Sequence, residues 1–202
     1  MRFESKVVFI TGGTKGLGKA MAQAFLAERA SVAVNSRSKE AVDRFAEELK
    51  GQQVLAFDVD IADHDAMEAM ASKVYETLGK VDILINNAGI VNPLVPSEKI
   101  KKDDFDRVID VNLKGTFYAT QAFGKRMVQQ GSGRIVSIAS QVALFGEKGF
   151  LPYAIAKSGL MMMTRQLAFE WSRHGVTLCA VAPGFIKGGM NEGLIRKEVF
   201  VN

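Results

Sequence analysis

The amino-acid sequence predicts an α/β fold in which a doubly wound parallel sheet carries helices on both faces. Six short apolar runs alternate with segments of helical periodicity along the 202 residues, and alternating units of this size are typical of a parallel sheet. A glycine-rich loop directly follows the first apolar run. No repeat, linker or low-complexity tract interrupts the pattern, so we expect residues 1–202 to form a single domain.

Strands are expected where β-branched and other apolar residues form short runs. These runs are KVVFIT at 6–11, SVAVN at 31–35, QVLAFDV at 53–59, VDILIN at 81–86, GRIVSIAS at 133–140 and VTLCAVA at 176–182. Most of these runs are apolar at nearly every position, as expected for strands that are covered on both faces.

The intervening helices are indicated by apolar residues at helical spacing. The first three helices carry Leu17, Met21, Ala24 and Phe25; then Val42, Phe45, Ala46 and Leu49; then Met67, Met70, Val74 and Leu78. Asp63 stands where it can cap the third of these helices. A long helix is expected at about 103–130, ended by the glycines of QQGSG, and another at about 153–173.

The glycine loop TGGTKGLG at 11–18 lies between the first strand and the first helix, with glycines at positions 12, 16 and 18. Glycines let the backbone approach a pyrophosphate, and the helix N-terminus offers free N–H groups and a positive dipole end. A turn without a ligand is the alternative, but the flanking strand and helix are the context that nucleotide binding requires. The loop therefore predicts a Rossmann-type domain that binds a dinucleotide.

Ser140, Tyr153 and Lys157 form the most informative pattern, with thirteen residues from serine to tyrosine and four from tyrosine to lysine. A lysine one helical turn from a tyrosine favours the phenolate, so we expect the pKa of Tyr153 to lie below its usual value of about 10. Such a tyrosine can act as a general acid or base, and the serine hydroxyl can hold a carbonyl oxygen beside it.

Composition excludes several other classes of protein. No apolar run reaches the length of a membrane span, and the chain enters a strand too soon for a signal peptide. His64 and His174 make no zinc spacing, so no metal is expected, and Cys179 is expected to be a buried core thiol. The net charge of +4 comes from interleaved charges, which predict solvated faces and no nucleic-acid partner. These features together predict a cytoplasmic protein.

Several motifs, in this order, resemble those of the short-chain dehydrogenase/reductase family over residues 5 to about 190. The matches are TGGTKGLG, Asp58 in FDV, Asn86-Asn87-Ala88-Gly89, Asn112 in DVNLKG, Ser140, Tyr153, Lys157 and Pro183-Gly184. Each match has a plainer explanation: Asn86 and Asn87 as turn formers, Asn112 as an ordinary helix residue, and Asp58 as a helix cap. The resemblance implies the strand order 3-2-1-4-5-6, followed by a seventh strand that is either missing from the protein or absent from these 202 residues.

The resemblance also implies roles for individual residues. Tyr153 exchanges the substrate proton, Lys157 lowers its pKa and holds the nicotinamide ribose, and Ser140 orients the substrate oxygen. Asn112 interrupts the helix geometry and holds a water against the lysine. The expected coenzyme-binding residues are Gly12, Thr14, Lys15, Gly16, Leu17, Gly18, Ser36, Arg37, Asp58, Val59, Asn87, Ala88, Gly89, Tyr153, Lys157, Pro183, Gly184 and Ile186.

The predicted coenzyme is NADP, with NAD as the other possibility. Relatives that prefer NAD place a carboxylate at the end of the second strand, where this chain has the neutral Ser36. Arg37 follows it and Lys15 stands in the glycine loop, and both are suited to a 2′-phosphate. The alternative is that Arg37 only stacks on adenine or points to solvent.

The sequence departs from the family after PGFI, where relatives have a helical lid and a seventh strand. Either the chain continues in register, with Gly188 where relatives have a threonine, or GGM is the turn after the seventh strand and a stretch is absent. We favour the second interpretation. Without the seventh strand, VTLCAVA becomes an exposed sheet edge.

The leading functional hypothesis is an NADP-dependent carbonyl reductase similar to the 3-oxoacyl-acyl-carrier-protein reductases, whose substrate is carrier-bound. A sugar or sugar-acid dehydrogenase of the gluconate or glucose type is the first alternative, because AFEWSRHGV resembles a segment of gluconate-type members. A non-catalytic NADP-binding protein is the second. The apolar surfaces of the helices at about 103–130 and from Tyr153 onward predict a homo-oligomer, most simply a homotetramer.

Overall fold

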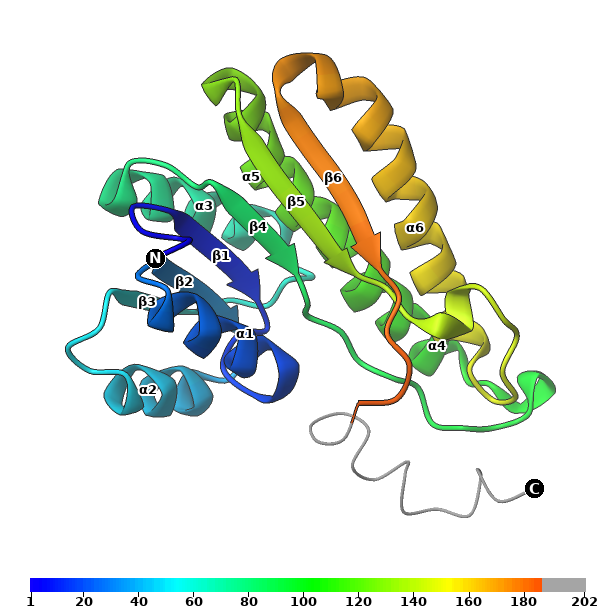
Figure 1. Ribbon diagram of the computed structural model, residues 1–202. Helices are drawn as coiled ribbons and strands as arrows, with labels where there is room; N and C mark the ends of the chain where they lie inside the picture. Colours follow the sequence, from blue (N-terminus) through cyan, green and yellow to red (C-terminus); the bar gives the residue numbers. More distant parts are fainter. Residues whose placement is uncertain (187–202) are drawn as a thin grey trace.

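The computed structural model of this protein describes residues 1–186. Its centre is a parallel sheet in the order β3-β2-β1-β4-β5-β6 (Figure 1). The strands are β1 (Val7–Thr11), β2 (Ser31–Ser36), β3 (Val54–Asp58), β4 (Ile83–Asn86), β5 (Gly133–Ile138) and β6 (Val176–Val181). The predicted strand order is therefore confirmed. The order reverses between β1 and β4, which is where open α/β sheets bind their ligands.

Helices cover both faces of the sheet, as predicted. They are α1 (Gly16–Ala27), α2 (Lys39–Glu48), α3 (His64–Leu78), α4 (Lys102–Ile109), α5 (Thr116–Gln130) and α6 (Leu151–Trp171). α1 and α2 pack on one face, whereas α3 and α5 pack on the other (Figure 1). The doubly wound architecture places every βα loop of the central strands at one edge of the sheet.

Alternating side chains of β1 divide the core into its two layers. Val7 and Phe9 join the cluster formed with α3 and α5, while Val8 and Ile10 join the cluster formed with α1 and α2. All four side chains are buried. This alternation follows from the period of two in a strand, and it explains why a central strand is apolar at every position.

The helix boundaries agree with the predictions in most cases. Asp63 caps α3 by accepting a hydrogen bond from the backbone N–H of Ala66 at 2.9 Å, and α3 ends at Gly79 with φ of +75°. The predicted buried face of α1 is wrong in part. Leu17 and Ala24 are exposed, because Gly18 and Ala22 are the residues that face the sheet.

The long helix predicted at about 103–130 is present, but it contains an irregular turn. A π-helical turn at Asp110–Gly115 joins α4 to α5, and Asn112 lies within it. π-turns insert an extra residue into a helix and often mark functional positions. The interruption at Asn112 that the family resemblance implied is therefore present.

β6 forms one edge of the sheet within residues 1–186, since it pairs there only with β5. Cys179 on β6 is half-buried, less buried than the core thiol that the sequence predicted, because this edge strand is incompletely covered. The predictions for Gly188 and a seventh strand lie outside the described residues. Within that described part, no helix is long and apolar enough to span a membrane.

Candidate active site

The glycine loop after β1 has the backbone form that a dinucleotide site needs. Gly12 and Gly16 adopt φ values of +65° and +52°, a region that side chains disfavour. A Cβ on Gly18 would collide with the Gly12 carbonyl oxygen and lie 2.6 Å from Asn87 Nδ2. Glycine at position 18 therefore permits the close packing of loop, helix and β4.

The N-terminus of α1 is open to an anion. Its N-cap residue, Lys15, makes no side-chain cap, and the first turn contains no acidic residue. The first backbone N–H groups of a helix lack intrahelical partners and carry a positive dipole end. Together with the glycine backbone, this end fits the pyrophosphate of a nicotinamide coenzyme.

The Asn86–Gly89 segment connects β4 to the glycine loop. Asn87 Nδ2 donates to the carbonyl oxygens of Thr11 and Gly12 at 2.9 and 3.1 Å. Thr11 Oγ1 accepts hydrogen bonds from the backbone N–H groups of Asn87 and Ala88, both at 2.9 Å. Asn87 thus holds the glycine loop in place and is more than a turn former.

Asn112 lies wholly inside the protein, with none of its surface exposed. Its Oδ1 accepts from the backbone N–H of Ile90 at 2.8 Å, and its Nδ2 donates to the Ile90 carbonyl at 2.7 Å. This paired bond joins the π-turn to the segment that follows β4. Asn112 is therefore not an ordinary helix residue, since its side chain positions the chain beside the candidate catalytic groups.

Lys157 is the most deeply buried charged residue of the site, with 3% of its surface exposed. Its Nζ donates to the Ile138 carbonyl oxygen at 2.7 Å. A Cβ built on Gly89 would lie 3.2 Å from Asn112 Oδ1 and 3.6 Å from Lys157 Nζ, so both polar groups converge on that glycine. Burial lowers the pKa of Lys157 to about 8, because an ammonium loses its hydration inside the protein.

Tyr153 lies one helical turn before Lys157 on α6, and Lys157 Nζ is 5.6 Å from the centre of its ring. Burial raises the pKa of Tyr153, and a hydrogen bond with Ser140 opposes this effect only in part. The predicted direction of this pKa was therefore wrong for the protein alone. The physical reason is that desolvation of the phenolate outweighs its stabilisation, while Lys157 Nζ is directed to Ile138.

Ser140 stands two residues after β5, and its hydroxyl lies close enough to Tyr153 to lower the pKa of that phenol, although less than burial raises it. Its Oγ also accepts from the backbone N–H of Val142 at 3.4 Å and begins a short 3₁₀ turn. The three residues of the predicted pattern are thus brought together from a strand end and one helix. A hydroxyl, a phenol and a lysine so arranged can carry out proton transfer at a carbonyl or alcohol oxygen.

The segment after β6 runs beside the turn that follows Ser140. The backbone N–H of Gln141 donates to the Pro183 carbonyl at 3.0 Å, and a Cβ on Gly184 would lie 3.1 Å from Gln141 Oε1. Pro183 and Gly184 therefore lie beside the turn that follows Ser140, and their predicted contact with the coenzyme stays a prediction. Ile186 is exposed and is the last residue described.

At the far end of the predicted coenzyme site, Ser36 ends β2 and pairs in register with Asp58 of β3. The backbone N–H of Val59 donates to the Ser36 carbonyl at 3.0 Å, and Asn35 Nδ2 donates to the Val59 carbonyl at 2.9 Å. Asp58 is exposed and does not cap α3, since Asp63 does. The plainer explanation of Asp58 as a helix cap is therefore excluded.

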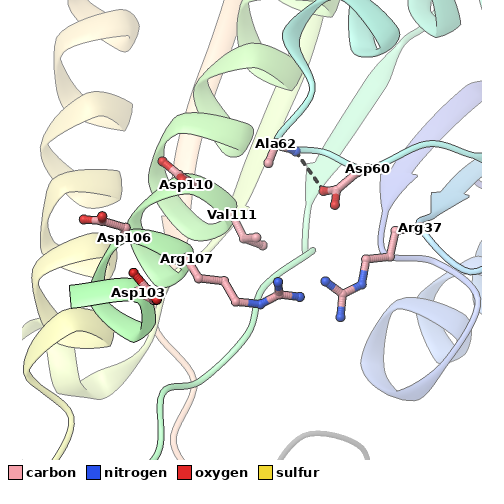
Figure 2. A pocket seen from close by; sticks show the side chains of 8 residues that line it. All are labelled: Arg37, Asp60, Ala62, Asp103, Asp106, Arg107, Asp110 and Val111. Carbon is pink, nitrogen blue, oxygen red and sulfur yellow. Dashed lines mark hydrogen bonds between the residues drawn. The ribbon is translucent and has the colours of Figure 1, made fainter. Parts of the chain in front are cut away.

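A cavity of about 300 Å³ lies beside this end of the site. Figure 2 shows its lining residues, which are Arg37, Asp60, Ala62, Asp103, Asp106, Arg107, Asp110 and Val111. Arg107 was missed by the sequence reasoning. It belongs to no motif, and only the tertiary structure brings it to the same cavity as Arg37.

Comparison with known proteins gives matches over nearly the whole chain. Residues 6–199 match the family described as short chain dehydrogenase. A 3-oxoacyl-[acyl-carrier-protein] reductase of Thermotoga maritima is 38% identical over 199 residues, which are 98% of this chain and 80% of the relative.

Two solved structures extend the comparison. A gluconate 5-dehydrogenase from Burkholderia cenocepacia in complex with NADP and tartrate has a TM-score of 0.90 at 29% identity, covering 98% of this chain and 78% of its own. An NAD+-bound xylitol dehydrogenase also has a TM-score of 0.90, at 27% identity, covering 94% and 74%. The fold thus occurs in a protein bound to NADP and in one bound to NAD+.

Proposed function

This chain belongs to the short-chain dehydrogenase family and is an oxidoreductase of the NAD(P)-dependent type, and we propose that it is an NADP-dependent carbonyl reductase acting on 3-oxoacyl groups. The observation that carries this proposal is the convergence of Tyr153, Ser140 and the buried Lys157 beside a glycine loop that fits a dinucleotide. A bound nicotinamide supplies the hydride chemistry. The protein supplies the proton and the placement of the substrate.

We assign the proton to the Tyr153 hydroxyl. Because burial raises its pKa, this phenol is protonated at neutral pH and is suited to donate a proton to a carbonyl oxygen during reduction. Ser140 lies beside the same phenol and opposes the rise of its pKa, so its hydroxyl can hold the substrate oxygen against Tyr153. Lys157, with a pKa of about 8, can replace the proton and bind the nicotinamide ribose, and Asn112 positions the chain beside it.

The coenzyme preference rests on charge at the end of β2. Ser36 is neutral, Arg37 follows it, and Lys15 lies at the open N-terminus of α1. A 2′-phosphate is attracted by the two cations, whereas a carboxylate at position 36 would repel it. Isothermal titration of the wild-type protein with NADPH and NADH tests this part, and tighter binding of NADH would contradict it.

An acyl substrate is supported by the apolar side chains next to the catalytic group. Leu144, Phe145 and Leu151 follow Ser140 or precede Tyr153, and Phe145 leaves 71% of its surface exposed. An exposed apolar wall beside a reacting carbonyl suits an acyl chain. The similarity to 3-oxoacyl-[acyl-carrier-protein] reductases agrees with this substrate class and with a carrier-bound form.

The second candidate is a sugar or sugar-acid dehydrogenase. It is favoured by the structural likeness to the gluconate 5-dehydrogenase and the xylitol dehydrogenase. Polyols need several hydrogen-bonding side chains in their pocket, and the apolar wall beside Ser140 supplies few. This candidate therefore ranks below the acyl substrate.

The experiment measures absorbance at 340 nm with two groups of substrates. Acetoacetyl thioesters with NADPH test the first candidate, while gluconate and xylitol with NADP test the second. Tyr153→Phe is the control, expected to lower turnover about 10²–10⁴-fold while the Kd for NADPH stays within twofold. Tight coenzyme binding with no turnover on any substrate would favour a non-catalytic NADP-binding protein instead.

We also propose a homotetramer that works in the cytoplasm, where it would use the NADP(H) pool. The proposal rests on apolar side chains that the described residues leave uncovered on α5 and α6. Phe117 is 39% exposed, Met162 59% and Phe169 84%. Apolar groups exposed along two neighbouring helices mark a contact surface, and closed two-fold symmetry is the common way to cover one.

A further inference from the structure

The cavity beside the end of β2 is bordered by two guanidinium groups from different parts of the chain. Arg37 follows β2, and Arg107 lies in the last turn of α4. Figure 2 shows both side chains extending into the space between these elements, with their guanidinium groups directed toward one another. Neither guanidinium makes a hydrogen bond or an ion pair with any of residues 1–186.

None of the four carboxylates that line this cavity forms an ion pair with Arg37 or Arg107 within residues 1–186. Asp106 pairs with Lys102, and Asp110 pairs with Lys114 at 2.8 Å. Figure 2 shows Asp106 on α4 and Asp110 on the π-turn after it, both on the side away from Arg37. Both carboxylates belong to the lining, but each is paired with a lysine four residues away in the chain and with neither arginine.

Two further carboxylates belong to the lining. Asp60 Oδ1 accepts a hydrogen bond from the backbone N–H of Ala62 at 3.0 Å, so it is held by its own loop. Asp103 lies one turn before Arg107 on α4 and makes no ion pair within residues 1–186. Between Arg37 and Arg107 themselves no carboxylate lies (Figure 2). The space between two like charges favours a dianion that can accept hydrogen bonds from both.

We propose that Arg107 is a coenzyme-specificity residue that, with Arg37, binds the 2′-phosphate of the adenosine half of NADP. This inference rests on the proposed NADP-dependent function. It adds to Arg37 and Lys15 a further cation, from a helix that contributes nothing to the expected glycine-loop and β2 contacts. Guanidinium groups bind phosphate oxygens in bidentate fashion. Two of them approaching from opposite sides would hold the phosphate more firmly than Arg37 alone.

Arg107 could contact either the 2′-phosphate or the adenine ring, and a comparison of NADPH with NADH distinguishes the two, because only NADPH carries the phosphate charge. Val111 and Ala62 give the cavity an apolar portion that suits a purine. A guanidinium that merely covered the purine would contribute equally to NADPH and NADH, since both carry the same ring. A guanidinium that binds the 2′-phosphate contributes to NADPH alone.

The experiment measures the Kd of NADPH and of NADH by isothermal titration for the wild-type protein and four variants. Arg107→Met keeps the length of the side chain but removes its charge, Arg107→Lys keeps the charge, and Arg37→Ala removes the first cation. Arg134→Met is the matched control. Arg134 is also exposed and makes no ion pair within residues 1–186. It lies at the amino end of β5, whereas Arg37 follows the carboxyl end of β2.

We expect Arg107→Met to raise the Kd of NADPH about tenfold, which is the effect of losing one charge-assisted hydrogen-bonded contact. The Kd of NADH should change less than twofold. Arg107→Lys should recover part of the loss, and added salt should narrow the difference between wild type and Arg107→Met. Arg134→Met should leave both values within twofold. Unchanged NADH binding also shows that the variants are folded.

Equal weakening of both coenzymes by Arg107→Met would overturn the inference and assign Arg107 to the adenine ring. Unchanged NADPH binding would overturn it as well. In either case, if Arg37→Ala weakened the binding of NADPH but not that of NADH, the proposed NADP-dependent function would still be supported. A wild-type protein that binds NADH more tightly than NADPH would instead refute the proposed coenzyme, and this inference with it.

Discussion

The ammonium group of Lys157 is buried away from water. Replacing Lys157 with methionine measures how much free energy of unfolding this burial costs. The pKa of Lys157 falls from 10.5 to about 8 because of burial. At about 1.36 kcal/mol per pKa unit, this corresponds to about 3.4 kcal/mol of lost stability at neutral pH. Methionine has a similar length and no charge, so Lys157→Met removes this cost.

The substitution also removes the hydrogen bond from Lys157 Nζ to the Ile138 carbonyl, which offsets about 1–1.5 kcal/mol of the gain. We therefore expect Lys157→Met to raise the free energy of unfolding by about 2 kcal/mol at pH 7. Its catalytic activity should be lost, because the methionine cannot exchange a proton or bind the ribose.

The pH dependence of the stability difference between Lys157→Met and the wild type separates the effect of the charge from the effect of packing. A lysine with a lowered pKa in the folded state is protonated more in the unfolded chain, so wild-type stability rises as the pH increases from about 8 to 10.5. Methionine does not titrate, so the change with pH depends only on the folded and unfolded pKa values of Lys157. The advantage of Lys157→Met should therefore shrink by about 1.3 kcal/mol between pH 7 and pH 9.

Urea unfolding without coenzyme, at both pH values and one protein concentration, measures this difference. Lys148→Met, which removes an exposed lysine in the loop before α6, is the control for the loss of a lysine side chain. A Lys157→Met advantage that is the same at pH 7 and pH 9 would show that the ammonium is not desolvated as we describe. A variant less stable than wild type at pH 7 would refute the reasoning altogether.

Three further predictions concern the loop, a helix cap and the surface. Gly18→Ala should weaken NADPH and NADH alike by about tenfold or more, because its Cβ collides with the Gly12 carbonyl; unchanged affinities in calorimetry would contradict this. Asp63→Ala should lower the free energy of unfolding by about 1 kcal/mol in urea, through loss of the cap to Ala66, and a weaker coenzyme affinity would argue against a purely structural role. Phe169→Asp should lower the molar mass found by light scattering at micromolar concentration, since the ring is 84% exposed. An unchanged tetramer would place the interface elsewhere.

The secondary structure was predictable because its signals are local. A run such as VVFIT reads as a strand through its own residues, and the Asp63 cap needs only the backbone three residues away. Even the buried face of a helix could be misjudged, as in α1, where Gly18 faces the sheet and Leu17 does not. Helical periodicity predicts that large apolar side chains face the sheet. Where a helix lies very close to a strand, only small residues fit at the contact.

The identities of Ser140, Tyr153 and Lys157 were available from spacing, but their electrostatics were not. The sequence suggested a lowered pKa for Tyr153 because Lys157 is one turn away. The structure shows that Lys157 Nζ is directed to the Ile138 carbonyl and that burial raises the Tyr153 pKa. Desolvation depends on everything that surrounds a group, which no pair of residues in a motif can specify.

The sequence by itself thus determined the order of strands and helices, the glycine loop and the chemistry-bearing side chains, since these follow from neighbouring residues and from recognisable motifs. Only the tertiary structure decided how buried Lys157 is and that Arg107 faces Arg37 across a cavity. The physical reason is that burial and charge pairing arise between segments far apart in the chain. Their strength depends on distance and on the exclusion of water, and both exist only once the sheet and its helices have assembled.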